Sequence, residues 1–201
     1  MHSFFNEIKK CSELFQEIRF DLTELPVPYV GKNKIKAILL GADPTNNGIK
    51  TDKGLKALET VFGIESDYEK FFFGPQMINL NALKISKDDL FIQNVCRNYF
   101  VKQTGNNKKW NAVAELWIKY LKEEIDEYPD IPIMVTAEKI IKVLTKTTVK
   151  ARDLYDYPEK HLPIYSESLQ REVYPLYRHP SYYLSNKSHS DYRNFLRKKL
   201  S

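Results

Sequence analysis

The stretch KIKAILLGADPTNNG, from Lys34 to Gly48, decides the fold prediction because its apolar run ends abruptly at an acidic turn. Residues 37–40 are typical of a buried strand, and the residues from Gly41 onward are typical of a turn. Asp43 stands at the head of that turn. Asp-Pro is a good turn pair in any protein, so this carboxylate either caps the turn or faces a ligand.

The rest of the chain alternates strand and helix patterns. Further strands are predicted at 88–96, 131–136 and 171–177, and helices at about 3–20, 53–62, 76–83, 110–125, 137–144 and 190–200. Residues 145–170 give no clear pattern. This alternation predicts an α/β fold: a three-layer sandwich with a central, mostly parallel four-stranded sheet flanked by helices. The length of 201 residues predicts one domain, 1–201, with the N-terminal helix packed on it.

Composition excludes several classes of protein. Hydrophobic residues make up 42% of the chain, which is enough for a core. No apolar run approaches the roughly 18 residues of a membrane span, and no signal-peptide pattern opens the sequence. The two cysteines, Cys11 and Cys96, form neither a metal-ligand spacing nor a disulfide framework. We therefore expect a cytoplasmic protein with no membrane partner, no metal and no cofactor.

The positive charge is concentrated near the C-terminal end. Between Arg178 and Ser201 there are six lysines or arginines and one acid, Asp191, within a chain of net charge +5. A basic segment beside a site indicates a polyanionic partner. A structural explanation is also open, because lysines and arginines near the end of a last helix complement the negative end of its dipole.

Polar residues gather where the predicted strands end. In open α/β sheets, ligands bind at the carboxyl ends of the strands. The segments that follow these ends contain Asp43, Asn46, Asn94, Asn98, Thr136, His179, Ser181 and Ser185. This placement favours a ligand-facing role for Asp43.

Several of these segments, in this order, resemble the uracil-DNA glycosylase superfamily. GADPTNNG resembles its water-activating motif, FIQNV its strand with a base-reading asparagine, and HPSYYLS its late His-Pro-Ser loop. The polar loop before Trp110 and the segment IPIMVTAEKIIKVL are similar as well, so the resemblance spans about Lys34 to Leu200. It implies a divergent, uracil-DNA glycosylase-like member that acts as a monomer in base excision repair on duplex or single-stranded DNA with a flipped base.

The resemblance also implies two catalytic residues. Asp43 would position a water and stabilise the cationic sugar of the transition state. His179 would donate a hydrogen bond to the departing base as negative charge develops there. His189, in the adjacent loop, is the second choice for this role.

Contacts to the substrate are expected from the neighbours of these residues, namely Ala42, Thr45, Asn46, Asn94, Ser181, Tyr183 and Leu184. The Asn94 amide would read the edge of the base, and Ser181 would bond a phosphate. Tyr183 matches the intercalating position and Leu184 is adjacent to it. Each has a structural alternative: an asparagine that satisfies a strand end, or a loop that packs on the core.

The sequence departs from the superfamily pattern around the base. Thr45 stands where the housekeeping enzymes have a tyrosine, which leaves room at the 5-position of the base, and Asn46 and Tyr182 replace a histidine and a proline. The superfamily has an aromatic residue that stacks on the base about a dozen residues after the aspartate, but Lys56 and Ala57 stand at that place here. Phe62 or one of the phenylalanines at 71–73 is a candidate substitute.

Two other functions stay open. The first is a relative of the same fold that binds nucleic acid or a free base without cleaving it. The second is an unrelated α/β hydrolase that acts on a small nucleotide, which would not require the basic C-terminal segment.

Overall fold

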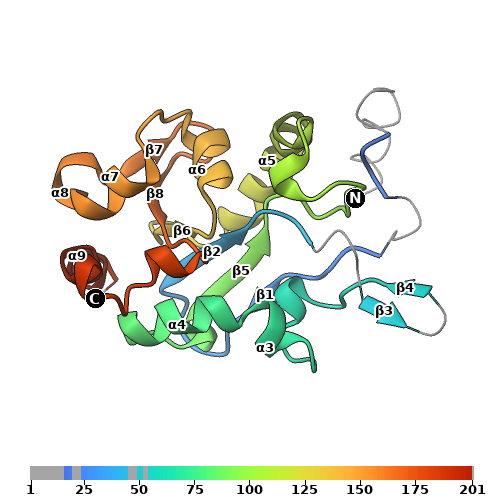
Figure 1. Cartoon of the computed structure of the whole chain (residues 1–201), viewed down its shortest axis with the longest axis horizontal. Coiled ribbons are helices and arrows are strands. Elements are labelled where there is room, and N and C mark those ends of the chain that lie inside the picture. Colours follow the sequence, from blue (N-terminus) through green and yellow to red (C-terminus); the bar gives the residue numbers. More distant parts are fainter. Residues whose placement is uncertain (1–15, 20–23, 45–48, 52–53, 201) are drawn as a thin grey trace.

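The computed structural model describes residues 16–19, 24–44, 49–51 and 54–200, and its centre is a mixed six-stranded sheet in the order β1-β5-β2-β6-β8-β7 (Figure 1). The strands are β1 (Tyr29–Val30), β2 (Ala37–Gly41), β5 (Leu90–Asn94), β6 (Ile133–Val135), β7 (Ile164–Ser166) and β8 (Arg171–Pro175). A separate hairpin pairs β3 (Ile49–Thr51) with β4 (Gly54–Lys56).

The four strands predicted from the sequence are neighbours in the middle of this sheet. β5, β2, β6 and β8 run parallel, and β1 and β7 add short antiparallel edges. The α/β class is therefore confirmed, and the sheet has six strands rather than the predicted four. Both extra strands are only two or three residues long, so neither carries a strand pattern of its own.

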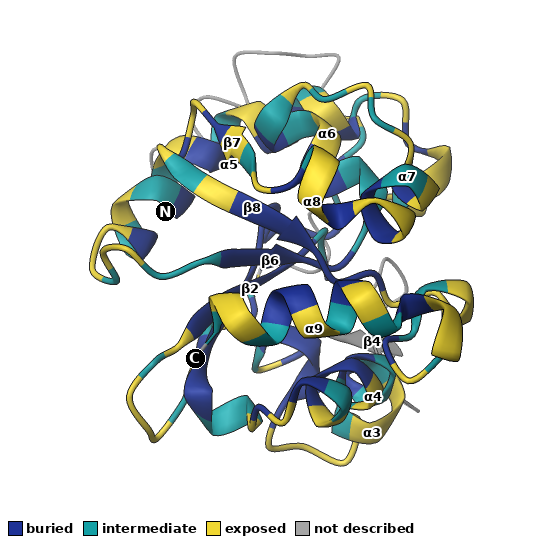
Figure 2. Cartoon of the chain, turned by 90° about the vertical axis from the view of Figure 1, so that its left-hand side faces the viewer, coloured by how far each residue is buried: buried dark blue, intermediate teal, exposed yellow. Residues whose placement is uncertain are grey.

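Helices lie on both faces of the sheet. In Figure 2, α5 (Trp110–Ile125) and α6 (Glu138–Thr145) lie on one side, and α4 (Gly74–Leu83) and α9 (Ser190–Lys199) lie on the other. The shorter helices are α3 (Glu69–Phe72), α7 (Ala151–Asp156) and α8 (Pro158–His161). Single 3-10 turns occupy Val61–Gly63, Lys87–Asp89, Thr104–Asn106, Pro180–Tyr182 and Lys187–His189. Within the described residues, every helix falls short of the length and apolar character that a bilayer crossing demands.

The core follows from the strand sequences. Residues 37–40 of β2 are fully buried, because helices cover the parallel sheet on both faces. On α5 the apolar side chains recur every three or four residues, and Val113, Trp117 and Leu121 form its buried stripe.

Two predicted helices are wrong where the structure describes them. Residues 16–19, the end of the predicted N-terminal helix, instead make an antiparallel bridge in which Ile18 pairs with Phe100. The predicted helix 53–62 is replaced by β4, a parallel bridge between Val27 and Thr60, and a 3-10 turn. The backbone of Val27 accepts from Val61 and donates to Glu59, and these bonds draw the segment into an extended form. The remainder of the predicted N-terminal helix, residues 3–15 and 20, lies outside the described residues.

Candidate functional site

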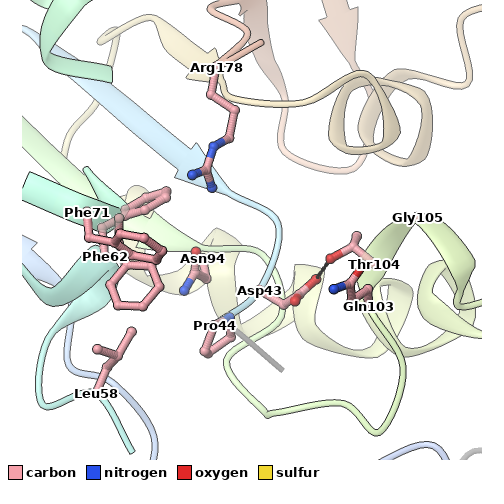
Figure 3. A pocket seen from close by; sticks show the side chains of 11 residues that line it. Asp43, Pro44, Leu58, Phe62, Phe71, Asn94, Gln103, Thr104, Gly105 and Arg178 are labelled. Carbon is pink, nitrogen blue, oxygen red and sulfur yellow. Dashed lines mark hydrogen bonds between the residues drawn. The ribbon is translucent and has the colours of Figure 1, made fainter. Parts of the chain in front are cut away.

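A cavity of about 390 Å³ opens at the carboxyl ends of the parallel strands. The four parallel strands lie side by side in the order β5, β2, β6, β8. The connection from β2 leads to β5 on one side, and the connection from β6 leads to β8 on the other, so the two connections leave in opposite directions. Such a switch point is where α/β sheets bind ligands. Asp43 follows β2, Asn94 ends β5 and Arg178 follows β8, and all three line the cavity (Figure 3).

Backbone pairing beyond the strands fixes the positions of these residues. Val95 and Cys96 donate to the carbonyls of Gly41 and Ala42 at 2.8 and 2.9 Å, so β2 and β5 stay together up to Asp43. On the other side, the Arg178 amide donates to the carbonyl of Thr136 at 3.1 Å. The cavity is therefore built on the ordered ends of the sheet, where catalytic geometry is best held.

Asp43 is anchored through one of its two oxygens. Thr104 Oγ1 and Trp110 Nε1 both donate to Asp43 Oδ2 at 2.7 Å. Among the described residues, no hydrogen bond reaches Oδ1. The carboxylate is thus held by one oxygen while the side chain borders the cavity, as Figure 3 shows.

Burial raises the pKa of Asp43 to about 6, and the hydrogen bonds from Thr104 and Trp110 and the charge of Lys139 oppose this rise. Lys139 Nζ donates to the carbonyls of Thr104 and Asn107 at 2.7 and 2.8 Å and lies 5.2 Å from the centre of the Trp110 ring. Lys139 therefore ties the loop that carries Thr104 to the start of α6. A carboxylate with a pKa near 6 is ionised at neutral pH yet poorly solvated, which is typical of functional sites.

Asn94 and Phe62 meet over Gly41. A Cβ at Gly41 would lie 2.2 Å from Asn94 Oδ1 and 2.5 Å from Phe62 Cζ, so only glycine permits this approach. Asn94 is 3% exposed, and its buried Oδ1 has no hydrogen-bond partner among the described residues. Phe62 has a left-handed backbone, with φ 55° and ψ 15°. Backbone strain of this kind in a bulky residue accumulates at functional sites.

Two further phenylalanines complete an aromatic wall. Phe71 and Phe72 line the cavity with their rings edge to face at 4.8 Å, and Phe71 is 75% exposed. Phe73 is fully buried and supports Phe62 at a ring distance of 5.8 Å. Of the aromatic residues considered as substitutes for the missing stacking residue, Phe62, Phe71 and Phe72 border the cavity and Phe73 belongs to the core.

His179 begins the His-Pro-Ser loop but does not line the cavity. Its side chain is exposed, and its Nδ1 accepts from the backbone N–H of Ser181 at 3.3 Å. Its chain neighbour Arg178 lines the cavity instead. His189, the second choice, is buried and bonds the Ser181 carbonyl through Nε2 at 2.8 Å, which is a structural role.

The remaining predicted contacts are distributed around this cavity and loop. Ala42 is half-buried beside Asp43, Ser181 is exposed and Tyr183 is half-buried. Leu184 is fully buried, and its backbone bonds Asn79, so its side chain is not available at the surface in this structure. Thr45 and Asn46 lie outside the described residues.

Sequence reasoning missed the residues that hold Asp43 and the cation opposite it. Thr104 and Arg178 lie in segments without a periodic pattern, and Thr104 is 61 residues from Asp43. Lys139 lies on the predicted helix α6, but the helical pattern does not indicate its bonds to the distant loop. For Trp110 the sequence gives one indication: a tryptophan buried at the start of a helix needs a hydrogen-bond acceptor for its indole N–H.

Two comparisons with known proteins were negative. The chain matches no protein-family model, and no curated protein matches it. Within the described residues, no group of three or more His, Cys, Asp or Glu side chains is arranged to hold a metal ion. The functional proposal therefore rests on the cavity itself.

Proposed function

We propose that this protein is a DNA glycosylase with a uracil-DNA glycosylase-like fold, and that it hydrolyses the N-glycosidic bond of uracil or a related modified base in DNA. The observation that carries the proposal is the arrangement of Asp43. Its desolvated carboxylate borders a cavity whose lining also includes Asn94 and the aromatic ring of Phe62. The amide oxygen of Asn94 has no hydrogen-bond partner among the described residues. A water activator, a base reader and a stacking surface are the three parts that removal of a flipped base requires.

Asp43 performs two tasks in this proposal. Thr104 and Trp110 fix Oδ2, so the carboxylate keeps one orientation and directs Oδ1 at a water or at the sugar. The transition state of glycoside hydrolysis carries positive charge on the sugar. A fixed negative charge in a poorly solvated site stabilises that charge better than water does.

Asn94 and Phe62 supply recognition of the base. A uracil edge offers acceptor, donor and acceptor, and one amide satisfies a neighbouring donor and acceptor together. Rotation of the Asn94 amide would bring Oδ1, which has no hydrogen-bond partner among the described residues, to the base N–H and supply the hydrogen bond that it lacks. Stacking of a base on an aromatic ring contributes about 1–3 kcal/mol, and Phe62 is placed beside Asn94 to provide it.

The His-Pro-Ser loop would face the DNA. Ser181 would bond a phosphate, and Tyr183, half-buried at the surface, would enter the stack that the flipped base leaves. Leu184 would support Tyr183 from beneath, since it is buried. The protein would act as a monomer and without a cofactor.

A panel of oligonucleotides tests the proposal. Single-stranded and duplex substrates that contain uracil, 5-hydroxymethyluracil, hypoxanthine or mismatched thymine are incubated with the protein and cleaved with alkali at abasic sites. We expect release of at least one base and a reduction of roughly a hundredfold or more in Asp43→Asn. Asp130→Asn is the matched control, because Asp130 is exposed and precedes β6 at the opposite end of the sheet. Asp43→Asn that is as active as Asp130→Asn would contradict the assignment.

The exposed His179 favours a second candidate, a non-catalytic protein of the same fold that binds nucleic acid or a free base. The predicted hydrogen bond to the departing base requires the imidazole at the cavity, and His179 lies outside the cavity lining. DNA binding that weakens steeply with salt, without release of any base from the panel, would establish this candidate instead.

A further inference from the structure

Arg178 is the cationic side chain among the described residues that line the cavity. Its backbone is fixed one step beyond β8 by the bond to Thr136, and Figure 3 shows its guanidinium directed into the space between Phe71 and Asn94. Within the described residues, this guanidinium forms no ion pair. A free cation is thus aimed at the space that the base would fill.

The neighbouring imidazole is directed elsewhere. His179 uses Nδ1 to accept from Ser181 and lies 6.4 Å, ring to ring, from Tyr182. The proline that follows His179 begins a 3-10 turn and leads the chain away from the strand end. The strand end therefore presents Arg178 to the cavity and His179 to solvent.

We infer that Arg178, rather than His179, supplies the positive charge that stabilises the departing base. This inference rests on the proposed glycosylase function and names a further catalytic residue for it. When the bond between sugar C1′ and the base nitrogen breaks, the electron pair leaves with the base, which becomes an anion. The guanidinium donates N–H bonds to a carbonyl oxygen of that anion and keeps its own protons.

The remaining atoms balance without another reactant. The oxygen of a water forms the new bond to C1′, and the proton that it loses passes to the Asp43 carboxylate and then to solvent. The base anion later takes a proton from solvent. Arg178 stays charged throughout, because arginine does not deprotonate in the working pH range.

A leaving-group comparison distinguishes this role from simple contact with a phosphate. Uracil and 5-fluorouracil differ in how readily they leave as anions, with 5-fluorouracil the better leaving group. A residue that stabilises the departing anion matters more for uracil. A residue that contacts a phosphate affects binding of both oligonucleotides equally.

The experiment measures single-turnover release of each base from otherwise identical single-stranded oligonucleotides. The variants are Arg178→Gln, which removes the charge, Arg178→Lys, which keeps it, and His179→Ala. Lys187→Gln is the matched control, since Lys187 is exposed in the same loop and outside the cavity lining. Thermal melting of each variant verifies that it is folded.

We expect Arg178→Gln to slow uracil release by roughly a hundredfold and 5-fluorouracil release by a smaller factor, with partial recovery in Arg178→Lys. The rate ratio of the two bases should stay unchanged in Lys187→Gln and in His179→Ala. Equal slowing of both bases in Arg178→Gln, or a changed ratio in His179→Ala alone, would overturn the inference while base release by the wild type upholds the glycosylase. Release by the wild type of neither base of this pair would overturn the inference, and release of no base from the oligonucleotide panel either would overturn both proposals.

Discussion

Replacing Asp43 by asparagine should make the protein more stable while it removes activity. Thr104 and Trp110 both donate to Oδ2, and one amide oxygen can accept both bonds. Asparagine therefore keeps these contacts and loses the charge. The charge is costly because burial raises the pKa of Asp43 from its ordinary 3.8 to about 6.

The pKa shift sets the size and the pH dependence of the effect. A pKa raised from 3.8 to about 6 corresponds to roughly 3 kcal/mol, an upper value because the side chain borders an open cavity. Below pH 3.8, both the folded and unfolded chains carry the protonated acid, and the cost is absent. Between pH 3.8 and about 6, the folded chain retains a proton that the unfolded chain releases, so rising pH lowers the free energy of unfolding.

Urea denaturation of the wild type and of Asp43→Asn at several pH values measures this cost. The difference in unfolding free energy between the two proteins should be close to zero below pH 4 and rise to at most roughly 3 kcal/mol above pH 7. For a chain of this length, the melting temperature of the variant should then be higher at neutral pH by at most about 6–12 °C. The comparison between proteins cancels the titration of the histidines.

Two results would refute this reasoning. A variant less stable than the wild type at pH 7.5 would mean that the carboxylate is well solvated or more strongly paired than the described contacts indicate. A stability difference that does not change with pH would mean that packing, rather than charge, separates the two side chains.

Three further substitutions test the construction of the cavity. Gly41→Ala should reduce activity at least tenfold, because its Cβ would lie 2.2 Å from Asn94 Oδ1 and displace the Phe62 ring. Thr104→Val removes a hydrogen bond to the charged form of Asp43, so the acid limb of the pH–activity profile should move above pH 6. Phe62→Leu should weaken substrate binding by roughly five- to 150-fold, as expected from loss of about 1–3 kcal/mol of stacking.

Each of these variants has a matched control. Gly74→Ala adds the same methyl group where no atom lies within 4 Å. Thr145→Val removes a hydroxyl that donates to the Ile141 carbonyl and accepts from the Thr147 N–H, outside the cavity lining. Phe195→Leu truncates a phenylalanine of similar burial, 7% exposed, on α9. Equal effects of a cavity variant and its control on activity would show that loss of stability, rather than the site, explains the result.

The sequence predicts the centre of the fold because its signals there are periodic. The apolar run at residues 37–40 and the stripe along residues 110–125 each carry a pattern that one structure satisfies, and the structure confirms both. The wrong predictions lie where the partner is distant. Residues 16–19 show helical spacing, yet they pair with a segment 82 residues away, a contact that local pattern cannot reveal.

The residues of the candidate site also divide into those that the sequence predicts and those that only the structure identifies. Asp43 follows one predicted strand and Asn94 lies near the carboxyl end of the next, so the rule for α/β sheets brings them together, and both line the cavity. Phe62 was one of several phenylalanines, and only its left-handed backbone and its approach to Gly41 distinguish it. The turn that begins at His179 directs this residue away from the cavity. The residue before it, Arg178, lines the cavity instead.

The same packing that positions Asp43 also makes it costly, and this links the site to the stability of the fold. A turn aspartate that only capped its own backbone would gain nothing from burial or from donors 61 and 67 residues away. Here the fold brings Thr104, Trp110 and Lys139 together around a carboxylate whose pKa is still raised. A buried charge of this kind is what the role proposed for Asp43 requires, whereas exchange of one atom for an amide nitrogen would remove its cost. The surroundings of Asp43 in the motif GADPTNNG therefore support the proposed chemistry over a turn that only caps its own backbone.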